Sequence, residues 1–123
     1  ATVEERLSLA IPYIPLASHA DYLFDNGLLG PDVERASILR ERLERLFSAV
    51  SPLSRPPLIP REGRAVVVGE VDAITPPSHG ERIARHWGVE PYYFGGAHLL
   101  QIGRTEAILS ALLRTSAALR DPR

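Results

Sequence analysis

Apolar and charged positions alternate with helical spacing over residues 32–50, which is the clearest secondary-structure pattern in the chain. Apolar side chains recur mostly at steps of three and four residues, and arginine and glutamate fill the positions between them. This period places the apolar side chains on one face of an α-helix. We therefore predict an amphipathic helix from Asp32 to Val50, whose balanced charges form a solvated face rather than an anion site.

Three short apolar runs have the composition of strands that are buried on both faces. The strongest is residues 65–71, where three consecutive valines lie between small residues. Such β-branched side chains suit a parallel strand that is covered on both sides. Residues 91–94 and 7–11 are the other two expected strands. The latter should leave the sheet at Pro12, because proline has no N–H to donate.

Two further helices are expected after these strands. In the first, residues 78–87, Ser78 and Glu81 have the spacing of a capping box, and Gly88 follows as a stop. Trp87 is expected in the core. The second, from about residue 104 to 119, should turn apolar side chains inward, among them Ile108 and Leu112. Three of the four histidines, His19, His79 and His86, are expected to face solvent.

The order of these elements divides the chain into three segments. Residues 1–17 hold the first strand. Residues 18–64 form a lid-like helical insertion with a short helical turn near residues 20–24 and a proline-rich connector, and residues 65–123 form a C-terminal βαβα core segment. Because crossovers between parallel strands are right-handed and short, the expected fold class is α/β, with about three parallel strands and flanking helices. The first strand would leave a bare sheet edge that invites pairing with another chain.

Composition changes this picture mainly by exclusion. The net charge of −1 and the 45% apolar content indicate an ordinary globular protein without a basic field for nucleic acid or an anionic membrane. The absence of cysteine excludes disulfides, zinc–thiolate sites and a cysteine nucleophile. No apolar run is long enough to span a bilayer, so a soluble, cytoplasmic location is the default expectation. No cofactor is expected either.

Two polar residues follow neighbouring strands of the predicted sheet. Asp72 comes just beyond the strand at residues 65–71, and His98 follows a glycine turn after the strand at residues 91–94. The carboxyl ends of parallel strands meet at one edge of a sheet, where ligands bind. A carboxylate there can accept from one ring nitrogen of the histidine, and the other nitrogen is left to take a proton from a nucleophile.

The segments VGEVDAITPP (68–77) and GGAH (95–98) resemble the acid-bearing and histidine-bearing segments of the α/β-hydrolase fold. The resemblance runs from about residue 65 to the end of the chain, with a weaker match at residues 7–16. It implies a partial α/β-hydrolase fold of the serine esterase or lipase type. Asp72 would be the triad acid and His98 the triad base, and the substrate would be a small ester.

One feature of that family is absent from the sequence. No Gly-x-Ser-x-Gly motif is present to supply a nucleophile and the neighbouring oxyanion amides. The resemblance therefore implies a C-terminal portion that is inactive alone, with the missing N-terminal half as its partner. The chain also lacks methionine, so Ala1 is not a retained start. Residues 1–8 look like a helix end running into a strand, which favours a cut from something longer.

Other interpretations of the same residues stay open. Asp72 could be the polar residue of a turn, and His98 a structural loop histidine. A metal site of Glu70, Asp72 and His98 is disfavoured, because no second histidine or aspartate cluster supports it. The alternative function is a non-catalytic α/β interaction module that binds a partner, or a second copy of itself, through the exposed sheet edge.

Overall fold

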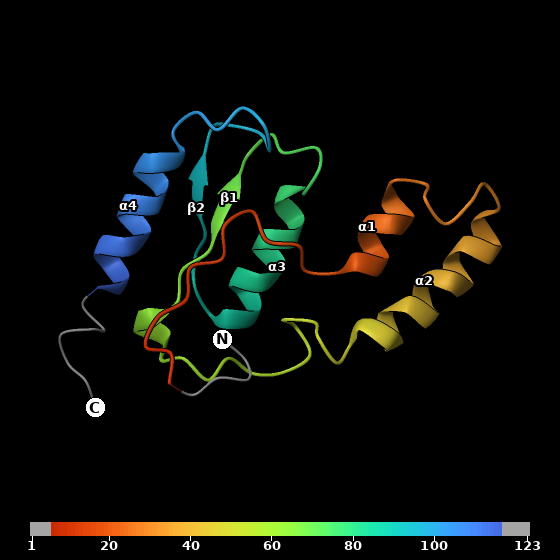
Figure 1. Cartoon of the computed structure of the whole chain (residues 1–123), viewed down its shortest axis with the longest axis horizontal. Coiled ribbons are helices and arrows are strands. Elements are labelled where there is room, and N and C mark those ends of the chain that lie inside the picture. The colour runs from red at the N-terminus through yellow and green to blue at the C-terminus, as the bar shows by residue number, and fades with distance from the viewer. Residues whose placement is uncertain (1–5, 117–123) are drawn as a thin grey trace.

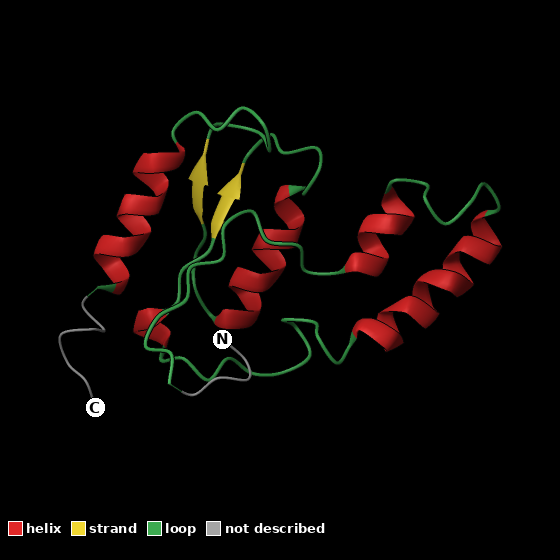
Figure 2. Ribbon diagram, in the orientation of Figure 1, coloured by secondary structure: helices red, strands yellow, loops and turns green. Residues whose placement is uncertain are grey.

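A computed structural model describes residues 6–116 of the chain. Its elements, in chain order, are α1 (His19–Asp25), α2 (Val33–Phe47), the 3₁₀ helix η1 (Arg61–Gly63), β1 (Val67–Gly69), α3 (Pro77–Trp87), β2 (Tyr92–Phe94) and α4 (Arg104–Thr115) (Figures 1 and 2). The helix end expected before the first strand and the last residues of the expected final helix fall at positions 1–5 and 117–119, which lie outside the described residues.

The regular sheet of the described residues consists of β1 and β2, which pair in parallel with Val67 opposite Tyr92. A third extended segment runs along the other edge of β1. It makes isolated parallel bridges at Ala10 and Tyr13, and the N–H of Ile14 donates to the carbonyl of Val67 at 2.8 Å. This is the segment that the sequence predicts as the first strand, and it pairs with β1 without forming a regular strand.

Proline explains why this pairing is interrupted. Pro12 contributes only its carbonyl, which accepts from the N–H of Val67 at 3.0 Å, because proline has no N–H of its own. Two residues later Ile14 has a φ of 42°, a left-handed conformation that is rare for a β-branched residue. The chain therefore stays paired with Val67 as far as Ile14 and leaves the edge of β1 there, two residues later than the predicted exit at Pro12.

Helices cover both faces of the paired strands, α3 on one side and α4 on the other (Figure 1). Val66 and Val68 join the cluster around Ile83 and Trp87 of α3, and Ala65 and Val67 join the cluster around Ala111 of α4. Successive side chains of an extended chain point to opposite faces. The valine run is thus buried from both sides, and Trp87 is in the core, as predicted.

α3 begins differently from the sequence prediction. Its N-cap is Pro76, Pro77 is the first helical residue, and no side chain caps the helix, so the predicted capping box of Ser78 and Glu81 is wrong. Proline at the first position has a preset φ and no N–H that needs a cap. The predicted stop is confirmed, because Gly88 ends α3 in a left-handed conformation with φ 68°.

One of the three histidines that are predicted to face solvent is buried. His19 and His86 are exposed, as predicted, but His79 is buried with only 2% of its surface accessible. It lies in the first turn of α3, on the side that the chain crosses before α1 begins. There the N–H of Ala17 donates to its ring at 3.3 Å. The prediction that His79 faces solvent was wrong because this crossing joins segments far apart in the sequence.

α4 packs on the strands through small side chains. Its buried residues are Ala107, Ala111 and Thr115, whereas Ile108 is only partly covered and Leu112 is exposed. The inward placement of Leu112 was therefore a wrong prediction, because the helix lies against the strands on its alanine stripe. None of the helices within residues 6–116 is long and apolar enough to cross a membrane.

α1 and α2 form a helical hairpin that lies on the α3 side of the core, with α4 on the far side of the strands (Figure 1). Each helix has a side-chain cap: Ser18 accepts from the N–H of Asp21, and Asp32 accepts from the N–H of Arg35. The two helices pack on each other, and α2 leaves Val33 and Leu46 exposed. α2 ends at Phe47, so Val50, which the sequence places in this helix, lies in the turn that follows and is exposed. The hairpin is thus attached to the core rather than built into it. These helices, and the extended connector that follows, occupy the segment predicted as a lid-like insertion.

We predict that Gly80→Ala destabilises the protein although alanine favours helices. A Cβ at this position of α3 would lie 2.5 Å from Cγ2 of Val68, whose χ1 is stiff. The clash should outweigh the gain in helix propensity of about 1 kcal/mol and cost about 1–3 kcal/mol net. Urea unfolding measures the change.

Arg85→Ala, an exposed position of the same helix, is the control and should change stability by about 0.5 kcal/mol or less. In the double variant Gly80→Ala with Val68→Ala, the loss should be smaller than the sum of the two single losses. Additive losses would contradict the clash.

Candidate functional site

The chain beyond β1 is held close to the loop beyond β2. A Cβ at Gly69 would lie 2.9 Å from the carbonyl oxygen of Gly96, so the two loops approach each other through glycine. Beyond this point the N–H of Glu70 donates to the carbonyl of Phe94 at 3.0 Å. The turn that carries Asp72 is therefore fixed to the carboxyl end of β2.

The carboxylate of Asp72 is completely buried, with a side-chain exposure of 0%. Its Oδ1 accepts the backbone N–H of Ile74 at 2.9 Å and that of Thr75 at 2.8 Å. Two charge-assisted hydrogen bonds offset part of the desolvation cost of a buried carboxylate. They also fix its rotation, so that Oδ2 is turned away from this backbone turn.

His98 lies on the glycine loop that follows β2. A Cβ at Gly96 would lie 2.3 Å from the carbonyl oxygen of Leu100, which shows how tightly the loop is folded. The N–H of Ala97 donates to the same carbonyl at 2.6 Å, and the Gln101 amide donates to the carbonyl of His98 at 2.9 Å. These bonds fix the backbone on both sides of the imidazole.

The structure brings the two predicted site residues together. Nδ1 of His98 lies 3.1 Å from Oδ2 of Asp72, within hydrogen-bond distance. The imidazole is 34% exposed, whereas the carboxylate is fully enclosed. Because the ionised carboxylate can only accept, Nδ1 must carry the proton of this bond.

This geometry leaves the other ring nitrogen available. Among the described residues none forms a hydrogen bond with Nε2 of His98. With the proton on Nδ1, Nε2 has a free lone pair. An imidazole oriented in this way can take a proton from an acid placed at Nε2, and the neighbouring carboxylate stabilises the imidazolium that forms.

Thr75 is a neighbour of the pair to which the sequence assigned no role in the site. Its N–H holds Asp72, and its Oγ1 lies 3.5 Å from Nδ1 of His98, at the limit of a hydrogen bond. The signal was present in the sequence, because an aspartate often accepts backbone N–H groups two and three residues ahead of it.

Tyr13 is the second neighbour that the sequence left without a role. Its ring stacks on Phe94 with the centroids 5.6 Å apart, at the end of the third extended segment. Burial raises the pKa of the phenol, Arg104 acts in the opposite direction, and the charge of Asp72 adds to the rise. Tyr13 thus presents a neutral phenol within electrostatic range of Asp72.

Nucleophiles and metal ligands are not gathered at this pair. Within residues 6–116 no serine forms a hydrogen bond with His98, and no group of three histidine, aspartate or glutamate side chains is placed to hold a metal ion. Glu70, which shares the loop with Asp72, is not part of such a group. Among the described residues the pair therefore consists of one carboxylate and one imidazole, without a serine or a metal-binding group beside them.

Similar proteins were found in one organism. The chain is 31% identical, over an alignment of 128 positions, to each of two uncharacterized proteins of Mycobacterium tuberculosis. These are MT2702 of strain CDC 1551 / Oshkosh and Rv2627c of strain H37Rv. The match covers 100% of this chain, which spans 30% of the length of each of these relatives. No family model and no solved structure matches the chain.

We predict that the neutral imidazole of His98 is protonated on Nδ1, and that Asp72→Asn moves the proton to Nε2. The amide oxygen would take the place of Oδ1 between the two backbone N–H groups, so the NH₂ group would face Nδ1 and require a lone pair there. Long-range ¹H–¹⁵N correlation spectra report which nitrogen carries the proton.

Asp32→Asn provides a matched control, because it makes the same charge change at an exposed N-cap aspartate. It should leave the His98 signals where they are. A wild-type protein whose neutral His98 carries its proton on Nε2 would contradict the assigned hydrogen bond.

Proposed function

We propose that Asp72 and His98 are the acid and base of a serine-hydrolase catalytic triad that transfers an acyl group from an ester to water. The nucleophile comes from a segment outside the described residues, and the fold that this segment completes is of the α/β-hydrolase type. The main support for this proposal is the 3.1 Å contact between the fully buried carboxylate of Asp72 and Nδ1 of the partly exposed His98 imidazole.

Each partner has a defined task in this chemistry. Nε2 of His98 takes the proton of a serine hydroxyl as the oxygen attacks the ester carbonyl, and returns it to the leaving alkoxide. Asp72 holds the ring in the required tautomer and stabilises the imidazolium while the proton resides on it. The second half of the cycle repeats these transfers with water in place of serine.

The open edge of the third extended segment supports completion by further chain. In its parallel bridge with Val67, Tyr13 turns its own N–H and C=O away from β1, and neither group has a backbone partner among the described residues. An unpaired edge of this kind accepts another strand. A strand added there would extend the sheet on the side away from β2.

Apolar side chains beside His98 support the same idea. Leu99, Leu100 and Ile102 are each at least 70% exposed, on the loop that carries the imidazole. An apolar group next to a catalytic pair is a surface for a substrate or for a covering segment. The Mycobacterium relatives have further chain outside the matched region, where such a segment has room.

The same open edge favours a second candidate function, an interaction or self-association module. In that case the edge of residues 10–14 pairs with the edge of a second copy. Size-exclusion chromatography with light scattering distinguishes the two. A concentration-dependent dimer supports self-association, and a monomer at all concentrations counts against it.

We predict that this chain alone hydrolyses p-nitrophenyl esters no faster than its His98→Ala variant, because it has no nucleophile at the pair. When it is expressed within a longer chain that supplies the nucleophile, ester hydrolysis should appear. In that longer protein Asp72→Asn should lower kcat by about 10⁴-fold, and His98→Ala by about 10⁴- to 10⁶-fold.

His86→Ala is the control for His98→Ala, because it removes another histidine, which is exposed on α3. It should leave kcat unchanged. Fast turnover by the 123 residues alone would refute an external nucleophile. Turnover in the longer protein that survives His98→Ala would refute the triad itself.

A further inference from the structure

The α1–α2 hairpin is joined to the core at a narrow place. The chain enters the hairpin at Ala17, which is buried in the cluster around Val66, and Leu53 packs against that same cluster after the hairpin ends. Between these two positions few groups connect the hairpin to the core. The contacts at the entry therefore decide whether the hairpin is held in place.

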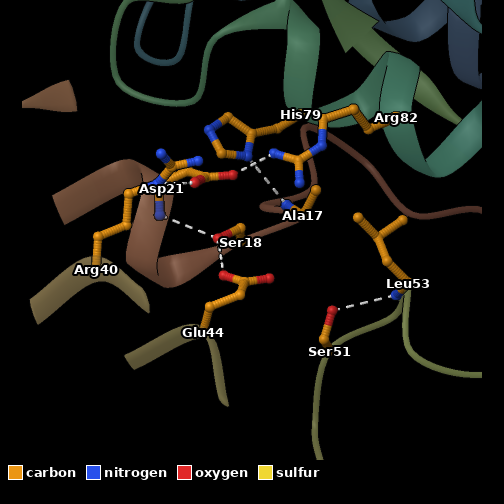
Figure 3. Close-up of polar contacts among 9 residues, drawn as sticks. All are labelled: Ala17, Ser18, Asp21, Arg40, Glu44, Ser51, Leu53, His79 and Arg82. Atoms are coloured by element: carbon orange, nitrogen blue, oxygen red, sulfur yellow. Dashed lines mark hydrogen bonds and ion pairs between the residues drawn. The ribbon is translucent and has the colours of Figure 1, made fainter. Parts of the chain in front are cut away.

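One carboxylate joins three helices at this entry. Asp21 of α1 accepts from Nε of Arg40 in α2 at 2.6 Å and from a guanidinium nitrogen of Arg82 in α3 at 2.5 Å (Figure 3). Ser18, the N-cap of α1, donates to Glu44 of α2 at 2.7 Å. The bond to Arg82 is the ion pair that crosses from the hairpin to the core.

A buried histidine lies beside this ion pair. Nδ1 of His79 faces the N–H of Ala17 at 3.3 Å (Figure 3). A backbone N–H can only donate, so Nδ1 must be the acceptor and the ring proton must be on Nε2. His79 serves this contact only while it is neutral.

We propose that the hairpin anchor, formed by Ala17, Asp21, His79 and Arg82, is a pH-sensitive attachment that releases the α1–α2 hairpin when His79 is protonated. A proton on Nδ1 places a donor against the N–H of Ala17, so the hydrogen bond is lost. It also places a positive charge in a buried site next to the Arg82 guanidinium. Both effects act on the few contacts that hold the hairpin.

The surrounding charges define the pH range of the release. Burial lowers the pKa of His79 and Arg82 lowers it further, while Asp21 and Asp25 of α1 act against them. The net result is a folded-state pKa below the ordinary 6.5. The unfolded or released state then binds more protons, so the attachment is complete above about pH 6.5 and weakens as the pH falls below it.

Asp21 responds in a separate range. Burial acts to raise the pKa of its carboxyl, but the hydrogen bonds and charges of Arg82 and Arg40 outweigh it and hold the pKa below the ordinary 3.8. The ion pair therefore loses its stabilising effect only as the pH falls below about 3.8. A change between about pH 7.5 and pH 5 is thus assigned to a histidine.

The chain contains no cysteine, so two introduced cysteines can carry spin labels without background. Arg35→Cys near the tip of the hairpin and Ser110→Cys on α4 are both exposed positions. Double electron–electron resonance measures the distance between the labels. At about pH 7.5 we expect one narrow distance distribution, and at about pH 5 a broad one that reports a released hairpin.

Variants separate the two parts of the anchor. His79→Asn places an amide oxygen near the position of Nδ1 that cannot gain a proton, so the distribution should stay narrow at both pH values. Arg82→Gln removes the ion pair and should give a broad distribution at both. His86→Asn, on the same helix, is the control and should behave as the wild type.

Two results would overturn the proposal. One is a wild-type distribution that remains narrow at about pH 5. The other is a His79→Asn protein that broadens with pH as the wild type does. The first result needs no variant, so a failure of His79→Asn to fold would leave the test decisive. Neither result depends on hydrolysis, and the test therefore stands apart from the proposed function.

Discussion

The burial of the chain from Ala65 to Gly69 on both faces and along both edges is the constraint on which the rest of the structure depends. Alternate side chains enter the α3 cluster and the α4 cluster, while backbone groups pair with β2 on one edge and with the segment 10–14 on the other. A strand enclosed in this way has little freedom to shift, because slipping by one residue would exchange its two faces. Its carboxyl end is thus a fixed point, and Asp72 follows it by three residues.

From this fixed point the site is built by close backbone approach. Gly69 and Gly96 let the two loops meet at a distance that a Cβ would not allow, and backbone donors then orient the carboxylate. The imidazole needs only to be held opposite Oδ2, which the folded loop of residues 97–101 does. The pair is therefore a consequence of strand pairing and glycine placement, and it needs no contact from the hairpin.

Much of this arrangement follows from patterns that act along short stretches of sequence. The valine run and the stop at Gly88 are present as predicted. The helix predicted over residues 32–50 is present as α2 (Val33–Phe47), which ends three residues earlier and buries only Ala36 of its apolar side chains. Asp72 and His98 were found because both follow strands, and parallel strands bring their carboxyl ends to one edge. The α/β-hydrolase fold itself stays a prediction, since two regular strands and one bridged segment do not identify it.

What the sequence did not reveal depends on contacts between distant residues. His79 looked like an exposed helix residue until Ala17, 62 positions away, placed a donor against it. The predicted start of α3 was wrong for a different reason. Pro76 and Pro77 begin the helix without a side-chain cap, so Ser78 and Glu81 do not form a capping box. Leu112 was expected inside because its period fits, but a helix that packs on alanines turns its larger side chains outward.

Different interactions therefore hold the α1–α2 hairpin and the strand that leads to the Asp72–His98 pair. Apolar burial on two faces holds the strand that leads to Asp72, and this burial varies little with proton concentration. A few polar groups hold the hairpin, and their hydrogen-bonding capacity depends on which atoms carry protons. His79 lies on the buried face of α3, one turn from Ile83, at the point where Ala17 enters the same apolar cluster. Its protonation acts on the contact with Ala17, and the apolar contacts of Ile83 and Trp87 with the valine run do not depend on it. The hairpin can thus be released while the burial of the strand that leads to Asp72 is kept.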